Sequence, residues 1–428
     1  MSAHAAYAEL LARLVPARRF GVVLGLDRMR ALLDRLGAPD RRLGAVVHVG
    51  GTNGKGSTVA IVAALAAAGG ARVAAYTSPH LSSLRERIVI DGAPITEEAV
   101  VAAAAEVEAA GGAALTFFEQ VTAIAIVAIA HAQVDVTLLE VGLGGRLDAT
   151  NVVAAPVAVV TGVALDHEGI LGDTLALIAG EKAGIFKPGQ RIVIGASGEP
   201  AAVPVLLAAA QAVGPAAVVT LVDEAAVAAV PPVALRGAHQ RRNAAAALAA
   251  LDHLTALGVV EVAAEVRARA LSTVTHPGRY EVLAPVADRP RVILDGAHNP
   301  HGAAALAAAL VADGERPTAI LAVSADKQVP ALLAPLAGVV DAVIATRYQQ
   351  ERALAPDDLA AIVRTVIPGI PVTTAPDLAS AVAMARGQGR TVLIAGSLFL
   401  VGEARTLLLG APTDPVRVSD PSRRGTAP

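Results

Sequence analysis

Short runs of apolar residues, rich in valine and isoleucine, alternate with longer alanine-rich segments along the first part of the chain. The longer segments have the length and composition of helices, and the short runs have the length of strands. Continuous apolar runs without polar alternation are typical of parallel strands that helices cover on both faces. The pattern therefore predicts a mostly parallel sheet with strands at 45–50, 72–78, 135–142, 156–163 and 191–196.

The same pattern restarts near residue 281, after a segment that Pro277 and Gly278 interrupt. We place a domain boundary there, because proline and glycine together break regular structure. The 428 residues suit two or three domains. The second half predicts further strands at 291–297, 317–324, 341–347, 371–375 and 391–397. The prediction is an α/β protein with a larger N-terminal domain (1–275), a linker (276–281), a smaller C-terminal domain (282–412) and a flexible polar tail (413–428).

The longest apolar segment, at 121–141, contains His131, Gln133 and Asp135. A membrane span needs roughly 18 uninterrupted apolar residues, so we interpret this segment as a buried helix that leads into a buried strand. The first residues lack the pattern of a secretory signal, and a cytoplasmic protein is expected. A net charge of −3 favours neither nucleic acid nor an anionic membrane as a partner. The absence of cysteine excludes disulfides and thiolate chemistry.

The segment GGTNGKGS, residues 50–57, lies between a predicted strand and a predicted helix. Its glycines let the backbone approach a phosphate closely, and the first amides of the helix would bind phosphate oxygens. Lys55 would meet the terminal phosphates, and the hydroxyl of Ser57 would reach them or a magnesium ion. The usual phosphate loop has this hydroxyl directly after the lysine, whereas Gly56 intervenes here. An ordinary glycine-rich turn is the alternative, but the order of strand, lysine, hydroxyl and helix favours a phosphate site.

Polar residues stand where other predicted strands end: Ser78, Glu140 and His167. The carboxyl ends of parallel strands face the crevice in which α/β proteins bind ligands, and oxygen ligands suit magnesium. A structural role is the alternative for the glutamate and the histidine. Lys182, in GEKAGIFKPG, has a solvated helix position as its alternative, which the sequence alone does not reject.

A set of motifs in a fixed order resembles the folylpolyglutamate synthase and dihydrofolate synthase family of the Mur ligase superfamily. The motifs are GTNGKGS, TSPHL, EVGLGGRLDATN, DHEGILGDT, GEKAGIFKPG, HQRRN, HPGRYE, LDGAHNP and AGSLFLVGE, and they span residues 20 to 405 approximately. The resemblance implies a P-loop-type N-terminal domain and a Rossmann-like C-terminal domain. It also implies an ATP-dependent amide ligase that adds L-glutamate to a folate carboxylate, or to dihydropteroate, through an acyl phosphate.

Site residues follow from the resemblance, position by position. The phosphate site of ATP is Thr52, Asn53, Gly54, Lys55, Gly56 and Ser57, and further nucleotide contacts are Asn243, Arg279 and Asp295. Ser78 and Glu140 match the ligands of one Mg²⁺, and His167 matches a ligand of a second. Lys182 matches a lysine that is carbamylated in the family, and His298 matches a residue that orients the phosphoryl group or glutamate. The implied site lies between the domains, whose closure would exclude water. The alternative, structural roles are a helix cap for Asn243, an ion pair for Arg279 and backbone contacts for Asp295.

The folate pocket that the resemblance implies contains Leu24, Thr116, Phe117, Phe118, Leu147, Asp148 and Ala149. An aromatic pair such as 117–118 is also common in protein cores. Members that use dihydropteroate carry an aspartate just before this leucine and glycine, where this chain has Val23. The departure bears on the dihydrofolate synthase activity. The resemblance also implies a monomer that uses small-molecule substrates, and K⁺ as an activator.

Two other functions compete with a folate ligase. One is a Mur-type ligase that extends a different carboxylate, such as a cell-wall precursor or an amino-acid polymer. A nucleotide-sugar substrate would bring an additional N-terminal domain, and only about forty residues precede the glycine-rich loop, counting along the sequence. The other is a non-catalytic P-loop module that binds ATP, which would have no use for the HPGRYE and DGAHNP motifs. Dependence of ATP turnover on glutamate would separate these alternatives.

Overall fold

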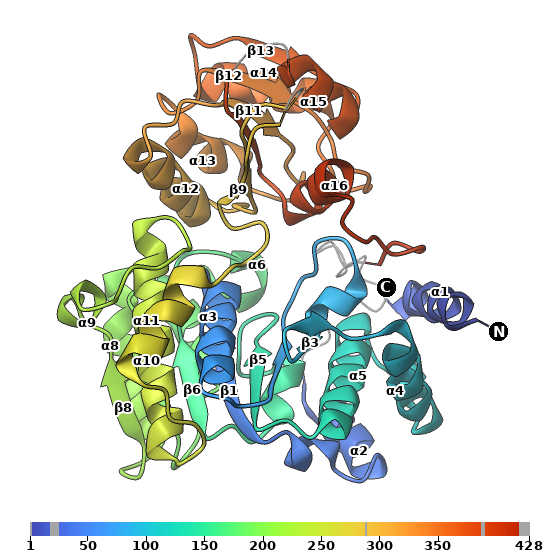
Figure 1. Ribbon diagram of the computed structural model, residues 1–428, viewed down its shortest axis with the longest axis vertical. Helices are drawn as coiled ribbons and strands as arrows, with labels where there is room; N and C mark the ends of the chain where they lie inside the picture. The colour runs from blue at the N-terminus through green and yellow to red at the C-terminus, as the bar shows by residue number, and fades with distance from the viewer. Residues whose placement is uncertain (1, 18–24, 287–288, 387–389, 419–428) are drawn as a thin grey trace. The chain divides into compact units, whose positions relative to one another are not determined.

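The computed structural model describes residues 2–17, 25–286, 289–386 and 390–418 (Figure 1). The chain forms two compact units. Unit 2 contains Leu235–Ala238 and Thr275–Thr413, and unit 1 contains the described residues before, between and after these segments. The main segment of unit 2 thus begins directly before the expected linker at 276–281, which has the sequence HPGRYE. No described helix is both long and apolar enough to span a membrane.

Unit 1 has an eight-stranded sheet in the order β4-β3-β2-β5-β1-β6-β7-β8. The pairs β2–β3 and β3–β4 are antiparallel, and the others are parallel. The predicted mostly parallel sheet is confirmed. Its strands are β1 (Ala45–Gly50), β2 (Val73–Tyr76), β3 (Ile88–Ile90), β4 (Ala93–Pro94), β5 (Val136–Glu140), β6 (Val157–Val160), β7 (Arg191–Ile194) and β8 (Val218–Leu221).

The helices of this part of the chain surround the sheet (Figure 1). Helix α3 packs on β1, β2 and β5, and α11 packs on α3. The helices are α1 (Ala3–Leu14), α2 (Asp27–Arg35), α3 (Lys55–Ala68), α4 (Glu97–Ala109), α5 (Phe117–Ala132), α6 (Glu168–Leu171), α7 (Leu175–Ala183), α8 (Val203–Ala212), α9 (Glu224–Ala228), α10 (Ala238–Ala256) and α11 (Ala264–Thr273).

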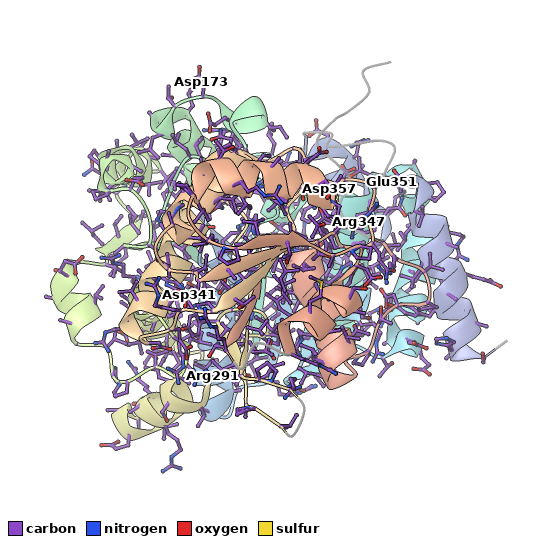
Figure 2. All side chains as sticks on the ribbon, turned by 90° about the horizontal axis from the view of Figure 1, so that it is seen from above. Asp173, Arg291, Asp341, Arg347, Glu351 and Asp357 are labelled. Atoms are coloured by element: carbon purple, nitrogen blue, oxygen red, sulfur yellow. The ribbon has the colours of Figure 1, made fainter. Side chains whose placement is uncertain are left out.

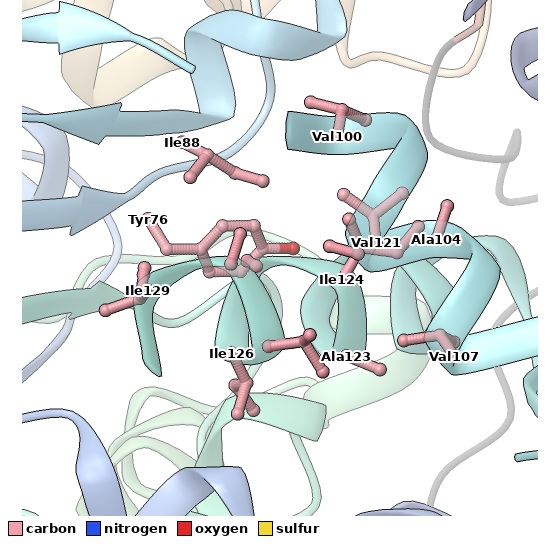
Figure 3. Close-up of a cluster of buried hydrophobic side chains, with 14 of the residues drawn as sticks. Tyr76, Ile88, Val100, Ala104, Val107, Val121, Ala123, Ile124, Ile126 and Ile129 are labelled. Carbon is pink, nitrogen blue, oxygen red and sulfur yellow. The ribbon is translucent and has the colours of Figure 1, made fainter. Parts of the chain in front are cut away.

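Helix α5 is the predicted buried apolar helix, and it leads into β5 as expected. Nearly all of its residues are buried, because it lies in the main core cluster of unit 1. Figure 3 shows Tyr76 of β2 and Ile88 of β3 beside Ile124 and Ile129 of α5. This burial on all sides explains why the segment reads as almost continuously apolar.

Unit 2 has a six-stranded sheet in the order β13-β12-β11-β14-β10-β9, parallel except for β9. Its strands are β9 (Glu281–Leu283), β10 (Val292–Asp295), β11 (Thr318–Leu321), β12 (Ala342–Ala345), β13 (Val372–Thr374) and β14 (Val392–Ala395). Its helices are α12 (Pro300–Ala312), α13 (Val329–Leu333), α14 (Pro356–Val366), α15 (Leu378–Arg386) and α16 (Leu398–Leu409). This smaller parallel sheet with helices confirms the predicted second α/β domain.

The amino ends of three neighbouring strands in unit 2 meet at one charge cluster. Asp341, labelled in Figure 2, directly precedes β12. It accepts hydrogen bonds from Arg316, before β11, at 2.8 Å and from Arg390, before β14, at 3.0 Å. Because both arginines are largely exposed, the cluster contributes little stability. The DGAHNP motif begins at the carboxyl end of β10 and therefore lies at the other end of the parallel strands.

The expected flexible tail differs from the structure at its beginning. Asp414 and Val418 are buried in unit 1, and Val418 belongs to the main core cluster of that unit. The prediction of a flexible tail is therefore wrong for residues 414–418, which pack against unit 1 although their composition is polar and includes proline. The remainder of the predicted tail lies outside the described residues.

Candidate active site

The glycine-rich loop connects β1 to α3, as the sequence predicts. Gly51 has φ 139° and Gly54 has φ 85°, in a region that other residues adopt only with strain. A Cβ at Gly51 would collide with Thr161, and one at Gly54 would collide with Asn243. Among the described residues, no side chain caps α3 at Gly54. A glycine at the N-cap has no side chain that could occupy the start of the helix, and such a start suits an anion.

The segment after β6 anchors this loop. The Thr52 amide donates to the Gly162 carbonyl at 2.9 Å. The Thr52 hydroxyl donates to the Ala164 carbonyl at 3.1 Å and accepts from the Ala164 amide at 3.0 Å. The Thr161 hydroxyl donates to the Asn53 carbonyl at 2.7 Å. These bonds hold the loop in one conformation before any ligand binds, which is the preorganisation that electrostatic catalysis needs.

Two lysines reach the loop. The Lys55 ammonium donates to the Thr52 carbonyl at 3.3 Å and lies 3.9 Å from Oε1 of Glu140. The Lys182 amine is buried and donates to the Gly51 carbonyl at 3.1 Å. Burial, and then the charge of Lys55, lowers the pKa of Lys182 to about 7. Lys182 is therefore a buried amine that is partly neutral near pH 7, and the sequence alternative of a solvated helix lysine is wrong.

Glu140 and Ser78 are brought together at the carboxyl ends of neighbouring strands. The Ser78 amide donates to Oε2 of Glu140 at 3.1 Å, and this carboxylate is buried beside the loop. In the part of the chain that the structure describes, no three His, Asp or Glu side chains converge on one point. A carboxylate and a hydroxyl still fit Mg²⁺, because Mg²⁺ prefers oxygen ligands and obtains several from water and phosphates.

His167 lies in the connection after β6, at the start of α6. It adopts φ 59° and ψ 28°, a left-handed conformation that costs free energy for a residue with a side chain. Its amide donates to Oδ1 of Asp166 at 2.9 Å, and its Nε2 lies 3.6 Å from Oδ2. Asp166 also opposes the lowering of the Lys182 pKa. The structure thus connects this histidine with the surroundings of the buried lysine.

Asn243 lies in α10 and contacts the loop. Its side chain is buried and stands where a Cβ at Gly54 would be. Its Oδ1 accepts from the Ser197 hydroxyl at 2.8 Å, and its Nδ2 donates to Gln240 at 3.0 Å. Because α10 begins at Ala238, Asn243 is no helix cap, and the sequence alternative for this residue is wrong.

Asp148 organises the turn that follows Glu140. Its Oδ2 accepts from the amides of Gly142 and Leu143 at 3.0 and 2.8 Å. Its Oδ1 accepts from the amide and the hydroxyl of Thr150 at 3.0 and 2.5 Å. Both carboxylate oxygens therefore have protein donors in this structure. Burial raises the pKa of Asp148, and these hydrogen bonds oppose that rise. Of the flanking residues expected in the folate pocket, Leu147 is exposed and Ala149 is buried.

A buried histidine completes this arrangement. His48 of β1 lies 2.8 Å through Nε2 from the Thr150 hydroxyl. Because that hydroxyl donates its own proton to Asp148, His48 must be the donor. Burial, followed by the charge of Lys187, lowers the pKa of His48 to about 3, so the ring is neutral. The chain from His48 through Thr150 to Asp148 fixes the turn that follows β5.

The expected folate contacts at the start of α5 divide into two kinds. Thr116 caps the helix, because its hydroxyl accepts from the Glu119 amide at 3.4 Å, and it also donates to the Glu119 carboxylate at 2.7 Å. Phe117 has 0% exposure and lies in the main core cluster, so the structure assigns it to the core and corrects its expected place in the pocket. Phe118 is only partly buried, and its ring stands where a Cβ at Gly142 would be. Leu24 and Val23 lie outside the described residues.

Unit 2 carries the remaining candidates around the end of β10. Asp295 is buried, and its carboxylate accepts from the amides of Tyr280 and Ala297 at 2.8 Å each. Burial raises the pKa of Asp295, and the charge of Arg279 opposes this. His298 lies 2.8 Å through Nδ1 from the Gly296 carbonyl. The sequence alternative for Asp295, backbone contacts in the loop, is therefore what the structure contains.

Sequence reasoning missed Thr161 and Asp166, and it missed the structural role of Asp148. Thr161 lies near the end of the predicted strand at 156–163 and directly follows β6 in the structure, so its place at a strand end was a usable signal. Asp166 stands in the DHEG motif directly beside a candidate ligand. The sequence carries no signal that the oxygens of Asp148 bind the turn, because that depends on backbone amides rather than on residue type.

Comparisons with known proteins agree with this arrangement. The Mur ligase glutamate ligase domain matches residues 278–398. A dihydrofolate synthase/folylpolyglutamate synthase of Mycobacterium tuberculosis is 37% identical over 441 residues, covering 89% of each chain. The structure of E. coli FolC in complex with DHPP and ADP has a TM-score of 0.82 and 31% identity, and the match covers 94% of this chain and 98% of that one.

A further solved structure is a bifunctional folylpolyglutamate synthase/dihydrofolate synthase with Mn, AMPPNP and L-glutamate bound. Its TM-score is 0.78 with 31% identity, and the match covers 91% of this chain and 95% of that one. These similarities extend over both units. The chain therefore belongs to the folylpolyglutamate synthase/dihydrofolate synthase family of the Mur ligase superfamily, and it is an ATP-dependent ligase.

Proposed function

We propose that this ligase joins L-glutamate to a carboxylate of a reduced folate, and also to dihydropteroate, with the loop of residues 50–57 as its phosphate site. The observation that carries the proposal is the anchored loop at the uncapped start of α3, with Lys55 between the Thr52 carbonyl and Glu140. The relatives solved with ADP, an ATP analogue, L-glutamate and DHPP support the choice of substrates.

The reaction has two steps. A carboxylate oxygen of the folate attacks the γ-phosphorus of ATP, and the bond from this phosphorus to the β,γ-bridging oxygen breaks. The products of this step are an acyl phosphate and ADP. The amine of glutamate then attacks the carbonyl carbon, and the phosphate departs with the former carboxylate oxygen while a proton is released to solvent. The α3 amides and Lys55 would stabilise the charge on the transferring phosphoryl group.

We assign the metal to the oxygen ligands near the loop. Glu140 and Ser78 would hold one Mg²⁺, and His167 would be a ligand of a second. When bound, Mg²⁺ supplies charge neutralisation at the phosphates. The chain supplies the position, because the Ser78 amide fixes Glu140 and Lys55 approaches the same carboxylate from the loop.

We further propose that Lys182 is carbamylated. Its amine is buried beside the loop, and its pKa of about 7 leaves a large neutral fraction, which is the form that reacts with carbon dioxide. The carbamate would replace a cation by an anion in a site that attracts Mg²⁺. Activation by K⁺, a monomeric state and a cytoplasmic location complete this proposal on the strength of the family resemblance.

For the folate pocket we propose Phe118, Leu147 and Ala149 as contacts, with Asp148 acting through the turn that it holds. Thr116 would act through the start of α5, and Leu24 remains a proposed contact outside the described residues. In unit 2, Arg279 and Asp295 would contact the nucleotide, and His298 would orient the phosphoryl group or glutamate. The position of Phe118 beside Gly142 supports its choice over Phe117.

The test is an assay with Mg-ATP and glutamate, supplied with dihydropteroate, with a reduced folate or with neither. We expect phosphate release and a mass gain of one glutamate residue with both folate substrates, and neither product in their absence. Extension of the reduced folate alone would restrict the enzyme to folylpolyglutamate synthesis. Phosphate release without extension of either substrate would contradict the proposed substrates. The Lys55→Met variant is the control for contaminating ATPases.

A further inference from the structure

A buried polar cluster connects the C-terminal segment with the loop after β2, and no step of the proposed reaction uses it. Asp414 is buried, and its Oδ1 accepts from the hydroxyls of Tyr7 and Ser83 at 2.9 and 2.7 Å. Its Oδ2 accepts from the Leu84 amide at 2.7 Å. The Asp414 amide in turn donates to the Ser82 carbonyl at 3.2 Å. The Asp414 carboxylate thus accepts hydrogen bonds both from α1 and from the loop after β2.

A second connection lies four residues further along the chain. Arg87, with 0% exposure, donates through Nε to Nδ1 of His80 at 2.9 Å. Because Nδ1 is then the acceptor, Nε2 of His80 carries the proton and donates to the Val418 carbonyl at 2.9 Å. Val418 itself packs in the main core cluster. The segment Asp414–Val418 is therefore fixed at both ends.

The loop that this segment holds contains the proposed metal ligand Ser78 near its start. Its base is closed by the Thr77 amide, which donates to the Arg87 carbonyl at 2.9 Å. Glu86 accepts from the amides of Leu81 and Ser83 at 2.8 and 3.1 Å, so the inside of the loop is also bonded. Ser78 is the point where this loop meets Glu140. We name residues Thr77–Arg87 the Ser78 loop.

We propose that residues Asp414–Val418 form a clasp that positions the Ser78 loop for catalysis. The clasp acts from outside the site: it fixes the far side of the loop, and the loop presents Ser78 to Glu140. Asp414 is a positioning residue in this account, since it touches neither substrate nor metal. The proposal rests on the assignment of Ser78 to the metal site.

The experiment compares two variants: one removes the Asp414 carboxylate, and the other removes one of the donors to it. Asp414→Ala removes the acceptor of the Ser83 hydroxyl and the Leu84 amide, whereas Tyr7→Phe removes only the donor on α1. Both lose buried hydrogen bonds, and we expect each to lower the melting temperature by at least about 2–4 °C. Asp414→Asn keeps the side-chain volume and one acceptor, and it serves as the conservative variant if Asp414→Ala folds poorly.

We expect the two variants to differ in catalysis and in loop protection. In Asp414→Ala, kcat should fall about 10-fold and the Mg²⁺ concentration for half-maximal rate should rise several-fold, because the ligand is misplaced. Hydrogen exchange at the Leu84 amide should quicken by at least about 10-fold. Tyr7→Phe should stay within about two-fold of wild type in kcat and Mg²⁺ dependence, and Asp414→Asn should lie between the two.

Two results would overturn the clasp. One is wild-type Mg²⁺ dependence and kcat in a folded Asp414→Ala variant, which would leave Asp414 as an anchor for stability alone. The other is unchanged exchange at Leu84. A wild-type enzyme without ligase activity would instead overturn the proposed function. The exchange measurement needs no substrate, so it would still show whether Asp414 holds the Ser78 loop. A chain that ends at Thr413 should resemble Asp414→Ala, because it lacks the same carboxylate.

Discussion

The loop after β1 in unit 1 and the loop after β10 in unit 2 can be compared directly, because each connects a buried strand to a helix. Each follows the carboxyl end of a buried parallel strand and leads into a helix. In unit 2, Asn299 caps α12 by accepting the Gly302 amide at 2.8 Å. In unit 1, no described side chain caps α3 at Gly54. The start of α12 is satisfied within the protein, whereas the start of α3 retains its capacity for an anion.

The acidic residues near the two loops differ in the same way. Asp295 accepts the Ala297 amide of its own loop with one oxygen and the Tyr280 amide, directly before β9, with the other. The loop after β1 is instead anchored by neighbouring residues, Thr161 and Ala164, and Glu140 faces Lys55 at 3.9 Å. The comparison teaches that the two loops are held differently: the segment after β6 anchors the loop after β1, whereas Asp295 of β10 bonds the Ala297 amide in the loop that follows it.

The largest expected effect follows from removal of the loop lysine. In Lys55→Met, kcat should fall by about 10²–10³-fold, because the lost ammonium would stabilise charge in the transition state. The variant loses the bond to the Thr52 carbonyl and the 3.9 Å ion pair with Glu140. It also loses the repulsion between the charges of Lys55 and Lys182, so the melting temperature should change little. Steady-state phosphate release and thermal unfolding measure the two quantities. A variant with more than a tenth of the wild-type rate would remove the chemical role of the loop.

A pH effect is expected from Lys182. Its pKa falls from 10.5 in the unfolded chain to about 7 in the folded state, so the unfolded chain binds more protons between these values. Stability should therefore rise with pH from about 7 to about 10.5. Lys182→Met should flatten this slope and add up to a few kcal/mol to the free energy of unfolding at pH 7, while turnover falls sharply.

Urea unfolding of both proteins at pH 7 and 9, in buffer free of carbon dioxide, measures the slope. Equal slopes in the two proteins would show that the pKa of Lys182 is not lowered in the folded state. Mass spectrometry after incubation with bicarbonate tests for the carbamate on the wild-type chain.

The smallest effect is expected in unit 2. Asn299→Ala should lower the free energy of unfolding by about 1 kcal/mol, the usual contribution of a helix cap. The kcat should fall far less than in Lys55→Met. Chemical denaturation followed by steady-state kinetics tests the contrast, with Asn299→Asp as the variant that restores the cap. A loss of turnover as large as that of Lys55→Met would abolish the distinction between the two loops.

Much of the fold was predictable because most strands are buried on both faces and read as continuous apolar runs. The strands without such a signal were missed: β8 is mostly exposed, and β3 and β4 form a short antiparallel hairpin. Asp91 and Gly92, at the turn of that hairpin, both have positive φ. An Asp-Gly pair at such a turn is a usable signal.

The candidate site was predictable where residues stand at strand ends, since parallel strands bring those ends together. Glu140 meets Lys55 for this reason. The anchoring roles of Thr161 and Asp148 depend on contacts with backbone groups that no residue pattern specifies. The division between Phe117 and Phe118 depends on which ring faces the core, and the sequence shows only an aromatic pair.

The most direct test of the account follows one oxygen atom. The folate substrate is labelled with oxygen-18 in its reacting carboxylate and is incubated with ATP, Mg²⁺ and glutamate. The phosphate that is released is then analysed by mass spectrometry. Transfer of the carboxylate oxygen through an acyl phosphate predicts one labelled oxygen in each phosphate formed. Unlabelled phosphate, accompanied by the extended folate, would contradict phosphorylation of the carboxylate at this site.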